Sequence, residues 1–281
     1  MNTPVNLLDL KKEDFQKFLD SFDHVFSDCD GVVWLNTALP GVGDFFRLMK
    51  KHGKTVNFVS NNSLRTKENY EGRFQDAGIE NGFENLIIPS VAISEYLKSI
   101  DFKKTVYCVS CSETTRMIRS YGFKCKVEVR FNFCMLLATY RLGERAPDAL
   151  PRSVRMSLSL SNPSSIPLKL QLQLLYYLSG TGVFTDIVAK ESNREPVLLG
   201  KPGRMFGEFA MKKAGVTKPS RVLFIGDMIA QDVGLGKATG FITLLLLTHV
   251  TKEKMLAQDK LRPDFYAASL ESLVPLLQNN L

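Results

Sequence analysis

Short apolar runs alternate along most of this chain with stretches in which apolar residues recur every three or four positions. The runs predict buried strands at 25–26, 55–59, 86–88, 105–109, 196–199, 221–225 and 242–247. The periodic stretches predict helices over 42–53, 66–77, 92–97, 133–142, 183–190 and 206–214, and one that ends near 121. Because strands and helices alternate, we expect an α/β fold built as a Rossmann-like, doubly wound parallel sheet.

Several polar residues fit the ends of these elements. Ser90 is placed to cap the helix over 92–97, and Gly53 and Gly78 are placed to end two others. The N-terminal 22 residues are polar and amphipathic without a signal-peptide core, and the run 242–247 is far shorter than the ~20 residues that span a bilayer. We therefore expect no membrane segment.

Composition narrows the function classes further. The net charge is +7, but lysines and arginines are dispersed and never form a run longer than a pair, so we expect no nucleic-acid partner. The five cysteines are an odd number, which favours reduced thiols and a cytoplasmic location. Cys108 and Cys111 lack the second pair typical of a zinc site. Cys29 lies between two aspartates, which suggests that its oxidation could block a site there.

Polar side chains follow four of the predicted strands directly. They are Asp28 and Asp30, Ser60 and Asn61, Lys201, and Asp227 with Asp232. Because ligands bind at the carboxyl ends of strands in open α/β sheets, we expect these side chains to converge. Carboxylates suit Mg²⁺, a lysine and a hydroxyl suit phosphate oxygens, and an aspartate can attack phosphorus.

Four stretches together resemble the haloacid dehalogenase superfamily of phosphatases. The stretches are 27–34, 58–63, 200–202 and 226–232, and the sequence at 262–266 and 269–270 matches as well. The branch with the greatest resemblance is the NagD-like one of 4-nitrophenylphosphatase, phosphoglycolate phosphatase and pyridoxal phosphatase. The resemblance covers residues 20–125 and 179–277.

The resemblance implies a role for each residue. Asp28 would be the nucleophile that forms an aspartyl-phosphate, and Asp30 would act as general acid and base. Mg²⁺ would be held by Asp28, Asp227 and the backbone carbonyl of Asp30, with Asp232 orienting the loop or a water molecule. The remaining predicted residues would bind the phosphoryl group, namely Ser60, Asn61, Asn62 and Lys201. Apart from the resemblance, we expect Trp34 to pack under the entry loop rather than to line the pocket, and His24, His52 and His249 to be ordinary structural or surface residues.

The resemblance also implies two domains. Residues 1–89 and 191–281 would form the catalytic core, and 90–190 an inserted α/β cap through which members of the branch often dimerise. Segment 126–178 departs from the family pattern, and either divergence of the cap or an error in the sequence accounts for this. We expect a Mg²⁺-dependent phosphatase acting on a small phosphorylated metabolite. The alternatives are a catalytically weak phospholigand-binding protein and a phosphoprotein phosphatase.

Overall fold

A computed structural model of the chain describes residues 3–62, 64–108, 110–127 and 196–281. The chain divides into two compact units. Unit 1 comprises Met1–Tyr96 and Leu198–Leu281, and unit 2 comprises Leu97–Val197. The predicted helices over 133–142 and 183–190 lie outside the described residues.

Unit 1 contains a seven-stranded sheet in which every neighbouring pair of strands is parallel. In spatial order the strands are β1 (Val5–Asn6), β9 (Phe265–Ala267), β8 (Ile242–Leu246), β7 (Val222–Gly226), β2 (His24–Ser27), β3 (Thr55–Val59) and β4 (Leu86–Ile87). From β2 the chain winds outward through β3 to β4, whereas β7, β8 and β9 follow one another in the opposite direction. The order therefore reverses between β2 and β7, and a crevice forms at such a point in open α/β sheets.

The central strands are apolar because helices cover both faces of the sheet. On β2, Val25 belongs to the main hydrophobic core, whereas Phe26 packs edge-on against Phe241 on the opposite face. All five residues of β7 are buried. Such double burial explains why these strands read as continuous apolar runs rather than as alternating ones.

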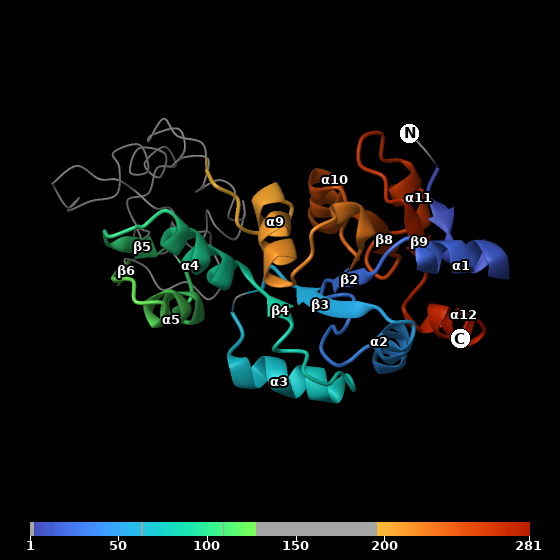
Figure 1. Cartoon of the computed structure of the whole chain (residues 1–281), viewed down its shortest axis with the longest axis horizontal. Coiled ribbons are helices and arrows are strands. Elements are labelled where there is room, and N and C mark those ends of the chain that lie inside the picture. The colour runs from blue at the N-terminus through green and yellow to red at the C-terminus, as the bar shows by residue number, and fades with distance from the viewer. Residues whose placement is uncertain (1–2, 63, 109, 128–195) are drawn as a thin grey trace, which may run out of the picture. The chain divides into compact units, whose positions relative to one another are not determined.

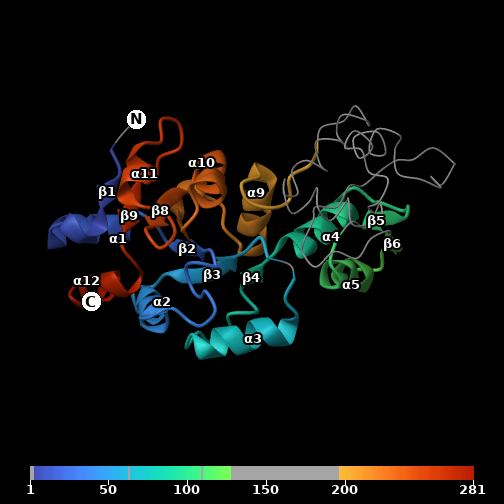
Figure 2. The ribbon, with the colours of Figure 1, turned by 180° about the vertical axis from the view of Figure 1, so that it is seen from behind.

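The helices of unit 1 form two layers around this sheet. Figures 1 and 2 show α2 (Val42–Lys51), α3 (Lys67–Asp76) and α12 (Val274–Gln278) on one face, with α9 (Arg204–Lys213) and α10 (Gly234–Thr239) on the other. Further helices of the unit are α1 (Lys12–Asp20) and α11 (Lys252–Leu256). Short 3-10 turns occupy Leu7–Asp9, Pro219–Arg221 and Glu271–Leu273, and a π-helical turn occupies Ile229–Val233.

The division between the units falls within α4 (Pro89–Ser99). The described part of unit 2 contains β5 (Val106–Cys108), α5 (Ser112–Ser120) and β6 (Cys125–Val127). β5 and β6 are parallel neighbours, and α5 connects them. The Sγ atom of Cys111 accepts a hydrogen bond from the Thr114 amide and caps α5.

The predicted fold class, a doubly wound parallel α/β sheet, is confirmed. The helix predicted over 66–77 is present as α3, and the Thr66 side chain caps it. Two local predictions are wrong. Residues 196–199 form no strand, because only Leu199 of this run is buried and a strand inside a parallel sheet needs burial along its length. Ser90 is not an N-cap, because α4 already begins at Pro89.

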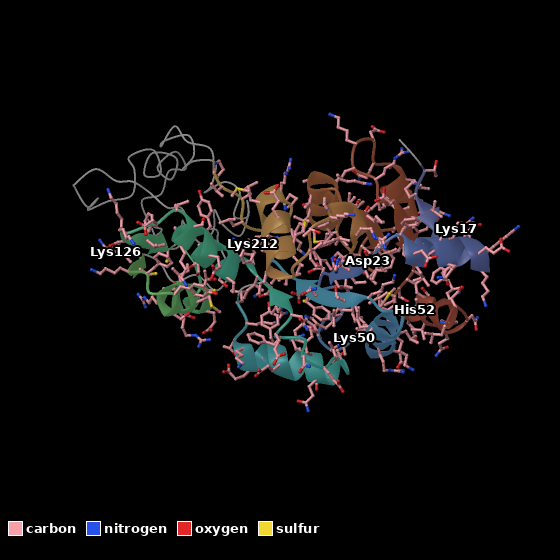
Figure 3. The ribbon with its side chains drawn as sticks, in the orientation of Figure 1. Lys17, Asp23, Lys50, His52, Lys126 and Lys212 are labelled. Atoms are coloured by element: carbon pink, nitrogen blue, oxygen red, sulfur yellow. The ribbon has the colours of Figure 1, made fainter. Side chains whose placement is uncertain are left out.

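The basic surface agrees with the dispersed charge of the sequence. Lys17, Lys50 and Lys212 come from three different helices of unit 1, as Figure 3 shows. Among the described residues, no helix combines the length and the apolar character needed to cross a bilayer.

Candidate active site

The predicted site residues of unit 1 meet where the strand order reverses. Asp28 directly follows β2, Ser60 follows β3 and Asp227 follows β7. The strand ends are held in register by two hydrogen bonds, from the Asp28 amide to the Ile225 carbonyl (2.8 Å) and from the Ser60 amide to the Ile87 carbonyl (3.0 Å). The topology itself thus brings together side chains that lie up to 199 positions apart in the sequence.

A buried lysine connects two of the carboxylates. Lys201 Nζ lies 2.7 Å from Asp28 Oδ1 and 2.8 Å from Asp232 Oδ1, and the lysine side chain is 1% exposed. Asp28 Oδ1 also accepts a 2.7 Å hydrogen bond from the Cys29 amide. Both contacts reach Oδ1, so Oδ2 is the oxygen of Asp28 that remains for a ligand.

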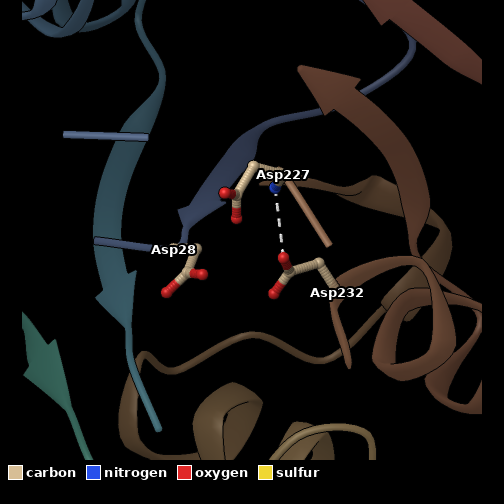
Figure 4. A group of neighbouring side chains, drawn as sticks. All are labelled: Asp28, Asp227 and Asp232. Carbon is tan, nitrogen blue, oxygen red and sulfur yellow. Dashed lines mark hydrogen bonds between the residues drawn. The ribbon is translucent and has the colours of Figure 1, made fainter. Parts of the chain in front are cut away.

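Asp232 holds the loop that follows β7. Its Oδ2 accepts hydrogen bonds from the amides of Asp227 (3.1 Å) and Met228 (2.9 Å), the first of which Figure 4 shows. Its Oδ1 is taken by Lys201. Gly226 permits this close approach, because a Cβ there would lie 2.2 Å from the Asp232 Cβ. Asp232 therefore orients both the loop and the lysine.

Asp227 carries an oxygen that needs a partner. Its side chain is buried, and Oδ1 has no hydrogen-bond partner among the described residues. Oδ2 lies 3.4 Å from His249 Nδ1. The prediction that His249 is an ordinary surface residue is therefore wrong in part, because its ring is exposed yet lies beside this carboxylate.

The charge balance of the buried cluster is negative. Burial raises the pKa of Asp28 to about 7 against the opposing charge of Lys201, and the charge of Asp232 adds to the rise. Burial, and then the charge of Asp232, raise the pKa of Asp227 to about 6. Burial alone would lower the pKa of Lys201, but Asp232 and Asp28 raise it above its usual value. Three carboxylates facing one ammonium group leave the cluster short of positive charge.

These groups fit a hard divalent cation. Oxygen atoms of Asp28, Asp227 and Asp232 lie within 4.8 Å of one another, as the grouping in Figure 4 illustrates. The unpartnered Oδ1 of Asp227 supplies a buried oxygen that a cation would satisfy. An all-oxygen donor set is typical of Mg²⁺ or Ca²⁺ sites.

Asp30 lies in a different environment, outside this group of three. Arg65 donates two hydrogen bonds to it, from Nη1 to Oδ2 (2.8 Å) and from Nη2 to Oδ1 (2.7 Å). Trp34 Nε1 donates to Oδ1 (3.0 Å), and Asn62 Nδ2 to Oδ2 (3.3 Å). Burial alone would raise the pKa of Asp30, but Arg65, then Asn62 and Trp34, hold it below its usual value.

The loop after β3 contributes three predicted residues with different contacts. Ser60 is buried, and its Oγ accepts from the Asn62 amide (3.1 Å). The Asn61 amide group donates to the Lys201 carbonyl (2.9 Å), and its Oδ1 accepts from the Lys201 amide (2.7 Å). Asn61 therefore fixes the backbone of Lys201.

Two predictions around Asp28 need correction. Cys29 is completely buried, and burial followed by the charges of Asp28 and Asp30 raises the pKa of its thiol well above the usual value. Because the thiolate is the form that oxidises, this environment argues against blockage of the site by oxidation at Cys29. Trp34 is buried and packs against Phe74, and beyond the packing role predicted for it, its Nε1 donates to Asp30.

Arg65, His249 and the Trp34 hydrogen bond were not predicted as parts of the site. Arg65 lies 35 positions from Asp30 and His249 lies 22 positions from Asp227. Each follows a predicted strand within a few residues, and that position was the signal available in the sequence.

Comparison with known proteins agrees with this geometry. Residues 25–124 match the family of haloacid dehalogenase-like hydrolases, and residues 198–273 match a second family of the same hydrolase type. The chain belongs to the haloacid dehalogenase-like hydrolases.

Similar proteins of known activity narrow the assignment from hydrolase to phosphatase. Phosphoglycolate phosphatase 2 of Arabidopsis thaliana is 26% identical, over 96% of this chain and 98% of the relative. The 4-nitrophenylphosphatase of Schizosaccharomyces pombe is 25% identical (93% and 96%), and the glycerol-3-phosphate phosphatase of Homo sapiens is 25% identical (96% and 95%). The solved structure of NagD from Escherichia coli K-12 has a TM-score of 0.64 at 19% identity, covering 89% of this chain and 98% of NagD. The predicted class, a phosphatase of the NagD-like branch, is confirmed.

Proposed function

We propose that this protein is a Mg²⁺-dependent phosphatase that hydrolyses small phosphomonoesters through an aspartyl-phosphate on Asp28. The observation that carries the proposal is the arrangement around this residue. Lys201 and the Cys29 amide bind Oδ1, whereas Oδ2 is free to attack phosphorus. A buried carboxylate with one fixed and one free oxygen suits nucleophilic catalysis.

Each half-reaction follows from the two aspartates. Asp28 Oδ2 forms a bond to phosphorus, the bond between phosphorus and the ester oxygen breaks, and Asp30 donates a proton to that oxygen so that an alcohol leaves. Asp30 then takes a proton from water, which attacks phosphorus. The bond to Asp28 breaks, inorganic phosphate forms and the carboxylate is restored.

The other residues bind and orient the phosphoryl group. The ammonium group of Lys201 lies beside Asp28 and offsets the charge of the phosphoryl oxygens. Ser60 and Asn62 would donate to these oxygens, and Asn61 would act by fixing Lys201. Mg²⁺ would be held by Asp28, Asp227 and the Asp30 carbonyl, and it supplies positive charge that stabilises the transferring phosphoryl group.

The size of the substrate, the position of the cap and the cellular compartment are further parts of the proposal, and each has its own support. The relatives are named for phosphoglycolate, 4-nitrophenyl phosphate and glycerol 3-phosphate, which favours a small substrate. The chain between the two parts of unit 1 would serve as the cap. The odd number of cysteines supports a reducing compartment such as the cytoplasm.

Hydrolysis of 4-nitrophenyl phosphate tests the proposal. We expect turnover with Mg²⁺, its loss with EDTA and its recovery when Mg²⁺ is restored. Asp28→Asn keeps the shape of the side chain but removes the nucleophile, so activity should fall to background. A folded wild-type protein without turnover on 4-nitrophenyl phosphate, 2-phosphoglycolate or glycerol 3-phosphate would contradict the proposal.

A further inference from the structure

We propose that Arg65 is the positioning residue for the acid and base Asp30, an inference that rests on the proposed function. The guanidinium group of Arg65 binds both oxygens of Asp30 in a planar two-point contact, at 2.7 and 2.8 Å. Such a contact fixes the plane of a carboxylate as well as its position, which a single hydrogen bond cannot do.

The surroundings hold Arg65 itself in place. Its side chain is 18% exposed, whereas that of Asp30 is 39% exposed. The guanidinium carbon lies 5.8 Å from the centre of the buried Tyr70 ring. The Tyr70 hydroxyl donates to the Asn62 carbonyl, so the start of α3 and the loop after β3 form one support. A side chain held in this way does not have to be ordered again in each catalytic cycle.

The hydrogen bonds that Asp30 accepts differ in length, and this difference suggests which of them opens when Asp30 transfers a proton. The carboxylate accepts four hydrogen bonds, so one of them must open before an oxygen can face the leaving group. The contact from Asn62 is the longest, at 3.3 Å, against 3.0 Å from Trp34 and 2.8 Å or less from Arg65. Asn62 is the donor that exchanges to the substrate, while Arg65 and Trp34 keep the carboxylate in place.

The consequence is a dependence on the leaving group. An alkyl phosphate needs a proton on its ester oxygen, whereas 4-nitrophenolate leaves as a stable anion. Loss of Arg65 should therefore slow formation of the phosphoenzyme from alkyl phosphates and spare it for 4-nitrophenyl phosphate. A residue that only stabilises the fold would affect both substrates equally.

Arg65→Met tests this difference in rapid-mixing experiments with Mg²⁺. We expect the first step with glycerol 3-phosphate or 2-phosphoglycolate to slow about 10- to 100-fold, because general acids contribute ~100- to 10,000-fold and loss of a positioning residue removes only part of that. The burst of 4-nitrophenolate should stay almost unchanged. Arg65→Lys keeps the charge without the two-point contact and should recover only part of the rate.

Arg73→Met is the matched control. Like Arg65, Arg73 lies against an aromatic ring, with its guanidinium carbon 5.7 Å from the centre of the Trp34 ring. It donates to the Leu35 carbonyl rather than to Asp30. We expect Arg73→Met to change the rates with the alkyl phosphate and with 4-nitrophenyl phosphate by the same factor. Fluorescence of Trp34, the single tryptophan of the chain, reports whether each variant is folded.

An Asp30→Asn background separates a direct from an indirect role. If Arg65 acts through Asp30, Arg65→Met should cause no further loss there. An equal loss on both substrates, or a further loss in this background, would overturn the role of Arg65 and leave the proposed function intact. Absence of turnover in the wild-type protein would overturn both.

Discussion

Asp28 and Asp30 are two residues apart, but their carboxylates are stabilised in different ways. Asp28 is buried beside a lysine and two further aspartates, with its pKa raised by burial. Asp30 is partly exposed and accepts from an arginine, an indole and an amide, with its pKa held low against the effect of burial. A nucleophile should be ionised and a general acid protonated, whereas the protein groups around these two carboxylates shift their pKa values in the opposite directions.

The two pKa shifts indicate that a bound cation and a bound substrate would act on different carboxylates. A cation beside Asp28 and Asp227 would favour their ionised forms, and a substrate that draws Asn62 away would remove one of the hydrogen bonds to Asp30. Added positive charge would thus stabilise the buried cluster around Asp28, whereas the cluster around Asp30 would respond to the exchange of one hydrogen bond. The first should matter for stability and the second mainly for rate.

The largest effect should come from Lys201→Met, which removes the only cation of the buried cluster among the described residues. Because Asp28 and Asp232 would then be buried without their partner, we expect unfolding to become easier by about 3–5 kcal/mol. Urea titration followed by Trp34 fluorescence at pH 8 measures it. Arg65→Met, which affects the partly exposed cluster around Asp30, is the comparison. An equally large loss there would remove the distinction between the clusters.

A smaller effect on the fold, with a large one on activity, is expected for Gly31→Ala. Gly31 has φ +87°, and a Cβ there would lie 2.0 Å from Asp227 Oδ2, so the carboxylate must move. Misplacement of a reacting group by about 1 Å costs ~100-fold in rate. Gly53→Ala is the control, because Gly53 has φ +75° with no atom close to the added Cβ. If Gly31→Ala and Gly53→Ala lose the same fraction of activity, backbone strain rather than displacement of the Asp227 carboxylate explains the loss.

Binding of Mg²⁺ should raise the thermal stability of the protein even when no substrate is present. At a Mg²⁺ concentration of about 100 times Kd, binding to the native state adds ~2.7 kcal/mol, which should raise Tm by roughly 5–10 °C. Differential scanning calorimetry measures the rise. Asp227→Asn should abolish most of it, because the substitution removes the negative charge of a buried carboxylate that would bind the cation. The same rise in Asp227→Asn would place the cation elsewhere.

The smallest effect concerns Asp264, which resembles Asp30 in being held by donors but lies away from the site. It accepts from the Thr243 amide (2.9 Å) and hydroxyl (2.8 Å) and from Lys237. Burial alone would raise the pKa of Asp264, but Lys237 and Thr243 lower it. Asp264→Asn should destabilise the protein by ~1 kcal/mol without changing kcat.

The pH dependence of that loss has a definite sign. A folded-state pKa below the unfolded value means that the ionised Asp264 stabilises the fold above about pH 4. This contribution disappears as the pH falls through the lowered pKa. The difference between wild type and Asp264→Asn should therefore be constant from pH 5 to 8 and shrink toward pH 3, as measured by urea titration. A difference that grows on acidification would contradict it.

The sequence was sufficient for the parallel sheet and for the convergence of its polar strand ends, because apolar runs and the residues after them obey simple rules of topology. It was insufficient for contacts that depend on how a loop folds back. The Arg65 contact with Asp30 and the His249 contact with Asp227 are of this kind. The run 196–199 misled because apolar character alone does not provide a neighbouring strand.

The contact of Asn61 with the backbone of Lys201 has a consequence for how this chain could be rebuilt. The contact joins residues 140 positions apart, and it lies close to where the chain returns to unit 1 at Leu198. The return point is thus fastened to the sheet independently of the length of the intervening chain, and loop length adds only slowly to the cost of closure. The place of Lys201 beside Asp28 is therefore set by contacts within unit 1 and should not depend on the length of segment 97–197.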